Sequence, residues 1–284
     1  METHHMGHMT SGEILRNSLM KLIFEGLGTM FLTITFNATA QPAKSTFASQ
    51  QVALLITMWV MVIFGMNISG AHYNPAVSLA YMLRKDVGRF PRILGLAYMI
   101  SQIVGAYVGA LISWFLLVPT SGDAATGLIA VNEFPPWSQS SAIFAGIIGE
   151  AIGTFITVFF YLTQTEQKTT FSKEKAINCF IIAAAYIAGR SMVQGQTSVL
   201  FNGASLPGGY AYCGAVLNPA IAIGTTLTML VNNASVCTNI WLFALIPLGG
   251  AVLAVLFHEF VFKKTHEALE ASDYKDEGDD NLLQ

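Results

Sequence analysis

The chain has 284 residues, of which 53% are hydrophobic and only 11% are charged, and its formal net charge is −3. Soluble domains carry about 25% charged residues, so this composition excludes an ordinary soluble protein. It favours an integral membrane protein with one compact helical domain, and it offers no basic surface for a nucleic acid.

Six apolar runs are long enough to cross a bilayer. They predict transmembrane helices at about residues 18–40, 50–68, 93–118, 141–163, 176–194 and 239–262. Two shorter runs, at about 75–84 and 219–231, reach only about halfway through a hydrocarbon core of ~30 Å, because a helix rises ~1.5 Å per residue. We therefore expect these two runs to be re-entrant half-helices.

The tripeptide Asn-Pro-Ala stands at the start of each short run. Its two copies are Asn74-Pro75-Ala76 and Asn218-Pro219-Ala220. Asn is a favoured N-cap residue and Pro fits the first position of a helix, so each copy predicts a helix start. Inside a bilayer such a start is tolerated only where its backbone is buried in protein or lines a wet cavity.

The two halves of the chain repeat one pattern. Glu25 lies early in the first long run and Glu150 early in the fourth, each just before a Gly-Thr pair. The halves, at about 18–118 and 141–263, then each contain three spans and one half-helix. Because three is odd, the second half must be inverted in the membrane, as in channels and transporters.

The positive charges indicate the orientation. Twelve of the fourteen Lys and Arg residues fall on one side of the six spans, and only Lys44 and Arg190 do not. The positive-inside rule makes that side cytoplasmic, with both termini there. We expect an N-terminal segment at 1–17, a membrane domain at 18–264 and a disordered acidic tail at 265–284.

The residues around the first motif read Ser-Gly-Ala-His-Tyr-Asn-Pro-Ala-Val-Ser at 69–78. With the second copy, they resemble the signature of the aquaporin, or major intrinsic protein, family over about residues 18–263. Other residues that sit where that family has them are Glu25, Gln102, Glu150 and Pro247.

The resemblance implies an all-α fold of six transmembrane helices plus two re-entrant half-helices in inverted repeats. It implies a passive channel for water, with small neutral solutes as a further class, that assembles as a homotetramer in the lipid bilayer. The sequence shows no nucleophile–base pattern and no phosphate-binding loop. We therefore expect no enzymatic activity, no cofactor and no metal.

The doubled motif predicts the chemistry of the pore centre. Two half-helices that meet N-terminus to N-terminus each present about +0.5 charge, which repels cations. Asn74 and Asn218 can cap their helices with the side-chain oxygen and donate their NH2 groups to a passing water. The resemblance assigns Glu25 and Glu150 to the support of the re-entrant loops. His72 is either a pore-lining or a packed histidine.

The outer selectivity filter departs from the family pattern. The residue after the second motif is usually Arg, and here it is Ile221. The other filter positions correspond to Leu54, Arg190 and Ala215. Arg190 lies roughly 22 Å along a helix from Lys175. We expect it to supply the missing cation, the alternative being that it extends to the outer surface.

Three alternatives remain open at this point. Without Arg190, an apolar opening at Leu54, Ala215 and Ile221 would suit glycerol or urea. Inverted repeats also occur in secondary transporters. A closed structural or adhesive protein could use the long segment 191–217 as a plug. Also open are a Cys213–Cys237 disulfide, glycosylation at Asn37 or Asn233, and the identity of the membrane.

Overall fold

A computed structural model of the protein describes residues 11–39, 47–84, 90–121, 140–200, 215–230 and 240–271. Within these ranges every regular element is helical. The elements are α1 (Ser11–Thr39), α2 (Phe47–Met66), α3 (Pro75–Leu83), α4 (Arg92–Ser121), α5 (Ser140–Thr165), α6 (Lys175–Leu200), α7 (Pro219–Met229), α8 (Ile240–Phe257) and the π-helix η2 (His258–Phe262). The expected all-α fold with six long and two short helices is confirmed.

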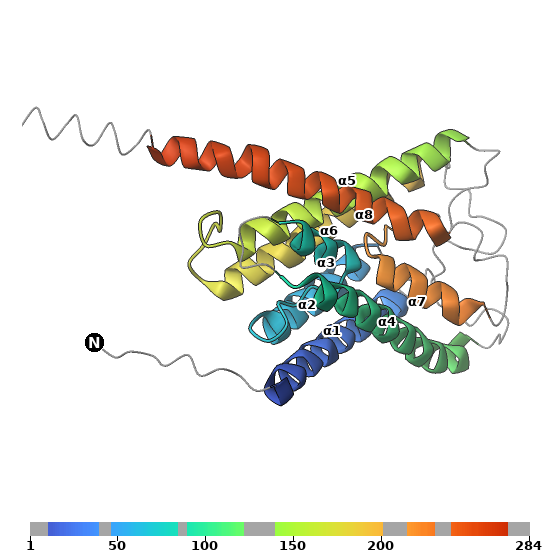
Figure 1. Cartoon of the computed structure of the whole chain (residues 1–284). Helices are drawn as coiled ribbons and strands as arrows, with labels where there is room; N and C mark the ends of the chain where they lie inside the picture. The colour runs from blue at the N-terminus through green and yellow to red at the C-terminus, as the bar shows by residue number, and fades with distance from the viewer. Residues whose placement is uncertain are drawn as a thin grey trace, which may run out of the picture.

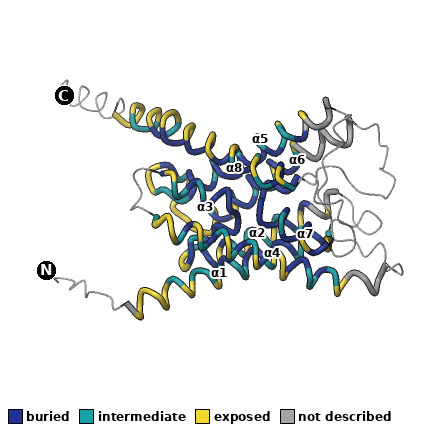
Figure 2. The backbone as a smooth tube through the Cα atoms, turned by 45° about the vertical axis from the view of Figure 1, so that its right-hand side comes forward, coloured by how far each residue is buried: buried dark blue, intermediate teal, exposed yellow. Residues whose placement is uncertain are grey.

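The two short helices lie inside the bundle formed by the long ones. They run from its centre in opposite directions, α3 to the left and α7 to the right (Figure 1). The start of α1 and the end of the last helix lie on the same side of the bundle, the left in Figure 1. We call this side the terminal face and the opposite side the distal face. Buried residues concentrate between the faces, where α3 and α7 begin (Figure 2).

The helices pack as a repeat. In the first half α1 packs against α2 and α4, and in the second half α5 packs in the same way against α6 and α8. Each half-helix also contacts the third long helix of the other half, because α7 lies on α4 and α3 lies on α8. Small residues allow α1 and α4 to cross closely, because a Cβ at Gly105 of α4 would overlap the Gly26 carbonyl of α1. The two halves are therefore one packed body.

The outer surface of the bundle is suited to lipid. Ile93, Leu96, Ile100 and Val104 are exposed at three- and four-residue spacing along one face of α4. Four helical stretches of the described residues are long and apolar enough to span a membrane, namely Gly12–Thr39, Arg92–Leu116, Gly146–Thr165 and Ile240–Ala271. The apolar part of α2 is too short for that criterion. α6 is not among these four stretches, and its distal half carries polar residues around Arg190.

The first and last described helices are longer than the sequence predicts. α1 begins at Ser11, before the expected start at 18, and the last helix continues through 271, beyond the expected boundary at 265. Asn37 is fully buried in α1, so this sequon is not accessible in the fold. Cys213, Cys237, Asn233 and residues 272–284 of the tail lie outside the described residues.

Candidate functional site

Both Asn-Pro-Ala motifs form capped helix starts at the centre of the bundle. The side-chain oxygen of Asn74 accepts a hydrogen bond from the Ala76 amide at 2.9 Å, and that of Asn218 accepts one from the Ala220 amide at 3.0 Å. Both asparagines are extended, with φ of −153° and −145°. Proline follows at the first helical position, where a missing N–H costs nothing.

Each asparagine also reaches across to the loop of the other half. The Asn74 amide nitrogen donates to the Leu217 carbonyl at 2.8 Å, and that of Asn218 donates to the Tyr73 carbonyl at 2.9 Å. The helix starts therefore face each other directly. One N–H of each amide is used in this crossed pair, so one N–H of each remains for a solute. The sequence analysis had assigned both N–H groups to the pore.

The two loops share one unusual backbone conformation. The residues one and three positions before each asparagine have positive φ: 50° at Tyr73, 55° at Ala71, 53° at Leu217 and 44° at Ala215. Left-handed backbone is unfavourable for residues with a Cβ and persists only where the surroundings hold it. The surroundings of Tyr73 include Gly28, where any Cβ would overlap the tyrosine ring.

Two buried glutamates bind these loops. The carboxylate of Glu25 accepts hydrogen bonds from the backbone amides of His72 at 3.0 Å and Tyr73 at 2.7 Å. The Ser69 hydroxyl, at 2.6 Å, and the Gln102 side chain, at 2.8 Å, also donate to it.

Glu150 plays the matching part in the second half. Its carboxylate accepts from the backbone amides of Val216 at 2.9 Å and Leu217 at 3.0 Å. Because both glutamates are fully buried, they fix otherwise unpaired backbone donors beside the motif.

We expect Glu150→Gln to lower the free energy of unfolding by about 1–3 kcal/mol. The amide oxygen of Gln can accept from one of the two backbone N–H groups, but its NH2 must face the other, which leaves a buried donor unpaired. Thermal unfolding of the purified protein measures the loss. Glu267→Gln is the control. Glu267 forms an exposed ion pair with Lys264, so this variant should leave the unfolding temperature unchanged. Equal unfolding temperatures for wild type and Glu150→Gln would contradict the expectation.

Arg190 is fully buried in the distal half of α6. Its Nη1 donates to the Ala215 carbonyl at 2.6 Å, and its guanidinium carbon lies 4.8 Å from the centre of the Phe36 ring. The alternative in which Arg190 extends to the outer surface is therefore wrong for this structure. Its Nε and Nη2 atoms have no hydrogen-bond partner among the described residues. A guanidinium carries five N–H donors, so those that the described residues leave unpaired can donate to a polar solute.

The other three filter candidates are buried and apolar. Leu54, Ala215 and Ile221 are each at most 1% exposed and belong to one apolar cluster. Of these, the structure brings Ala215 into direct contact with Arg190. The distal side of the motif thus combines an arginine from α6 with apolar surroundings.

His72 is packed among aromatic side chains on the terminal side of Asn74. Its ring centre lies 4.4 Å from that of Tyr81 and 6.0 Å from that of Tyr161. Its Nδ1 lies 3.1 Å from the Ser78 hydroxyl. His72 is 2% exposed, close to the 4% of Asn74, so the pore-lining and the packed alternatives of the sequence analysis both stay predictions. The sequence analysis did not single out Tyr81, which lies in α3, or Tyr161, which lies in α5.

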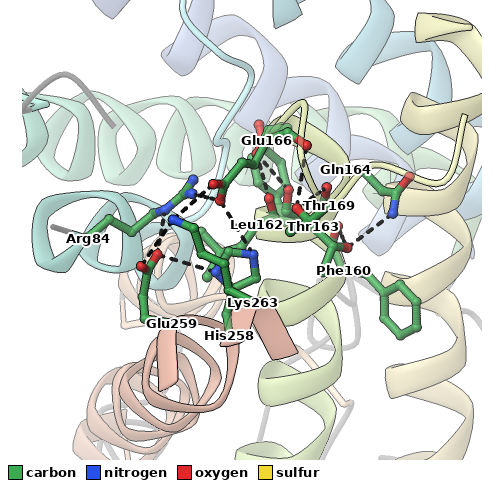
Figure 3. Close-up of polar contacts among 12 residues, drawn as sticks. Arg84, Phe160, Leu162, Thr163, Gln164, Glu166, Thr169, His258, Glu259 and Lys263 are labelled. Atoms are coloured by element: carbon green, nitrogen blue, oxygen red, sulfur yellow. Dashed lines mark hydrogen bonds and ion pairs between the residues drawn. The ribbon is translucent and has the colours of Figure 1, made fainter. Parts of the chain in front are cut away.

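A cluster of charged residues joins three elements at the terminal face (Figure 3). Arg84, which directly follows α3, binds Glu166 after α5 and lies 3.2 Å from Glu259 of η2. Lys263 lies 2.9 Å from Glu166 and 3.5 Å from Glu259, and His258 packs beside both carboxylates. We call these five residues the terminal ion cluster. The sequence analysis missed it, because its members come from distant segments.

The terminal ion cluster contains the one group of potential metal ligands found among the described residues, formed by Glu166, His258 and Glu259 within 4.8 Å. Both carboxylates are already paired with Arg84 and Lys263. Two negative and two positive groups balance, so a divalent cation would have to displace a paired cation. The arrangement therefore fits a structural ion network better than a metal site.

Comparisons with known proteins agree with this geometry. The sequence pattern of the family described as Major intrinsic protein matches residues 8–258. The chain is 29% identical to Aquaporin TIP1-1 of Arabidopsis thaliana over 264 residues, which cover 92% of this chain and 90% of the relative. It is 28% identical to Aquaporin TIP1-1 of Zea mays over 278 residues, or 96% and 95% of the two chains.

Among solved structures, the aquaglyceroporin from Plasmodium falciparum superposes with a TM-score of 0.65 at 17% sequence identity, over 88% of this chain and 99% of that one. At that identity the likeness concerns the fold. The fold, the paired motifs and the match over most of the length lead to one conclusion: the chain belongs to the major intrinsic protein family.

Proposed function

We propose that this protein is a passive membrane channel for water, with small neutral solutes as a further class. The observation that carries the proposal is the crossed pair of Asn74 and Asn218 at the meeting point of two half-helices. Similarity to aquaporins over nine-tenths of the chain supports it. The mechanism is single-file diffusion with no covalent step.

Selectivity against cations at the centre follows from fixed dipoles. The N-termini of α3 and α7 face each other, and each contributes about +0.5 charge. One N–H of each asparagine is left to donate to a water molecule, which then presents its oxygen to both residues. A water molecule held this way cannot pass a proton along a continuous hydrogen-bonded file.

The arginine that usually follows the second motif is Ile221 in this chain. On the distal side, Arg190 of α6 supplies the positive charge in its place. Its Nε and Nη2 atoms, which have no hydrogen-bond partner among the described residues, support this assignment. The apolar character of Leu54, Ala215 and Ile221 favours small neutral solutes as the second candidate class. Loop support by Glu25 and Glu150 preserves the spacing of these groups.

Further parts of the proposal concern topology and assembly. The channel domain comprises residues 18–264, between the segment 1–17 and the tail 265–284. The terminal face is the cytoplasmic one, because the cationic residues concentrate there. The protein is a homotetramer in the bilayer with one pore per subunit, in keeping with its family resemblance.

Stopped-flow light scattering of proteoliposomes tests the function. We expect osmotic water flux well above that of empty vesicles, with the same flux when sodium and proton gradients are absent. Flux that requires such a gradient would indicate a secondary transporter. Flux equal to that of empty vesicles, for correctly assembled protein, would favour a closed structural role.

Asn218→Asp should reduce water permeability by about tenfold, the factor that corresponds to one lost hydrogen bond of ~1.4 kcal/mol. The carboxylate can still cap α7, but it cannot donate to the Tyr73 carbonyl or to water. Its negative charge should also admit cations, measurable as vesicle conductance. Asn233→Asp is the matched control, because it makes the same change outside the motif. Unchanged water flux in Asn218→Asp would contradict the role of the amide.

A further inference from the structure

A pocket of about 660 Å³ lies between the first turns of α1 and the start of α4, near the terminal face. Residues 68–70, in the loop that leads to Asn74, form its third wall. We call it the α1–α4 pocket. It contains neither of the paired asparagines and none of the four filter residues, so the proposed channel function does not account for it.

One part of the α1–α4 pocket is polar and cationic. Lys21 is half-buried in its lining, and Asn17 and Ser18 lie one helical turn before it. None of the described residues that line the pocket is acidic. A lysine ammonium is a compact positive charge with three donors, which suits a phosphate group. The polar part of the lining therefore favours an anionic ligand.

The start of α4 adds to the positive potential around Lys21. The Gly95 amide donates to the Pro91 carbonyl at 2.9 Å, and the backbone amides before Gly95 belong to the first turn, where partners within the helix are missing. The helix dipole contributes about +0.5 charge at this end. Arg92, which directly follows Pro91, is also exposed. Side chain and helix end thus favour the same sign of ligand.

The rest of the α1–α4 pocket is apolar and exposed. The side chains of Ile14, Met20 and Ile68 line it and are 51%, 44% and 39% exposed. A free phosphate would leave these side chains uncovered, whereas the acyl chain of a lipid would cover them. Apolar residues beside a basic group are also typical of segments at a membrane surface. The lining therefore fits an anionic phospholipid better than a soluble anion.

The equivalent helix pair of the second half offers a comparison. A groove of about 590 Å³ lies between α5 and α8, and every described residue that lines it is apolar, Phe155, Leu253 and Phe260 among them. An acyl chain can lie in such a groove, but no group there recognises a charged headgroup. The repeat of the fold explains a groove in each half. It does not explain the lysine of the α1–α4 pocket.

We propose that the α1–α4 pocket binds an anionic phospholipid from the leaflet at the terminal face, with the headgroup phosphate on Lys21 and an acyl chain along Ile14 and Met20. Basic pockets between transmembrane helices on the cytoplasmic side are suited to such headgroups. This site goes beyond the proposed function, because lipid binding requires no flux through the pore.

The bound lipid would contact the support of the first motif. Ser69 lines the α1–α4 pocket, and its hydroxyl donates to Glu25 at 2.6 Å. Tyr98 also lines the pocket and donates to the Ser69 carbonyl at 2.8 Å. A lipid in this position packs against the loop that Glu25 holds. Because the pocket exists only in the folded protein, bound lipid should stabilise the fold.

Thermal unfolding of the delipidated full chain in detergent tests the proposal. Phosphatidylinositol, which has a phosphate and no cation in its headgroup, should raise the unfolding temperature in a saturable way. Phosphatidylcholine should raise it less, because its choline cation is repelled by Lys21. Lys21→Ala should weaken the apparent affinity for phosphatidylinositol by about fivefold, the factor that corresponds to one basic residue at an anionic lipid surface. Lys21→Arg should retain the affinity.

Lys173→Ala is the matched control. Lys173 is an exposed lysine between α5 and α6, and it lines a different pocket at the terminal face. Its replacement removes the same charge and should leave the affinity for phosphatidylinositol unchanged. An equal loss in Lys173→Ala and Lys21→Ala would show non-specific attraction and would overturn the proposal. Lys21→Gln keeps most of the side-chain length and replaces Lys21→Ala if that variant does not fold.

Two further results would overturn the lipid site. Inositol 1-phosphate has the same headgroup without acyl chains and should stabilise the protein much less, so equal stabilisation would assign the pocket to a soluble anion. Equal titration curves for phosphatidylinositol and phosphatidylcholine, or no response to either, would exclude an anionic lipid. Water flux enters none of these measurements, so failure of the lipid site and failure of the channel function are observed separately.

Discussion

Arg84→Ala should lower the free energy of unfolding by about 3–5 kcal/mol, because it removes the cation shared by two largely buried carboxylates. The side chain of Arg84 is 2% exposed, and those of Glu166 and Glu259 are 11% and 7% exposed. Lys263 alone then remains to balance both negative charges. Thermal unfolding of the detergent-purified protein measures the loss, and we expect a clear decrease in the unfolding temperature.

Two variants control this prediction. Arg84→Lys retains the charge but cannot form the planar fork that reaches both carboxylates, so its loss should be smaller. Lys264→Ala removes an exposed pair with Glu267, which should contribute at most about 1 kcal/mol. If Arg84→Ala unfolded like Lys264→Ala, the terminal ion cluster would not stabilise the junction of α3, α5 and η2.

The second large effect is expected for Arg190→Ala. A unit charge about 4 Å from a passing cation at an effective dielectric constant of ~20 repels it by about 4 kcal/mol, so the loss of Arg190 should raise cation permeability by up to about a thousandfold. Glycerol permeability should rise as well, because the surroundings that remain at Leu54, Ala215 and Ile221 are apolar. Vesicle conductance and stopped-flow scattering measure the two quantities in the same preparation.

Stability and selectivity can be separated with two companion variants. Arg190→Ala also leaves the Ala215 carbonyl without its donor, so thermal unfolding should accompany the flux measurements. Arg190→Lys keeps a charge with fewer donors and should retain part of the cation exclusion. In the double variant Arg190→Ala with Ile221→Arg, the cation returns at the position that is usual for the family and exclusion should recover. Unchanged ion exclusion in Arg190→Ala would show that Arg190 is not part of the selectivity filter.

Residues next to the motifs were the ones that the sequence could locate. Asn74 and Asn218 precede Pro at a fixed spacing, and capping depends on residues two positions away, so local chemistry predicts both helix starts. The inverted arrangement followed from an odd number of spans in each half. The depth of Arg190 followed from its distance along α6, although its contact with the Ala215 carbonyl did not.

The groups that the sequence could not locate depend on contacts between distant segments. Tyr161 meets the Gly70 carbonyl across 91 positions, and Arg84 meets Glu259 across 175. Nothing in their immediate neighbours distinguishes these residues from ordinary packing or surface residues. The helix ends were displaced for a related reason: a polar, charged stretch such as 265–271 looks like a tail, yet it continues the helix beyond the π-helical turn.

The crossed asparagine bonds also have a consequence for biogenesis. They join residues that are 143 and 145 positions apart, so neither bond can form until the second half of the chain has been synthesised. At about 5–20 residues per second, the first re-entrant loop must wait roughly 10–30 s for its partner. During that interval the Asn74 amide has no Leu217 carbonyl to bind. We expect the first half to remain loosely packed during translation and the pore centre to be the last part of the fold to form.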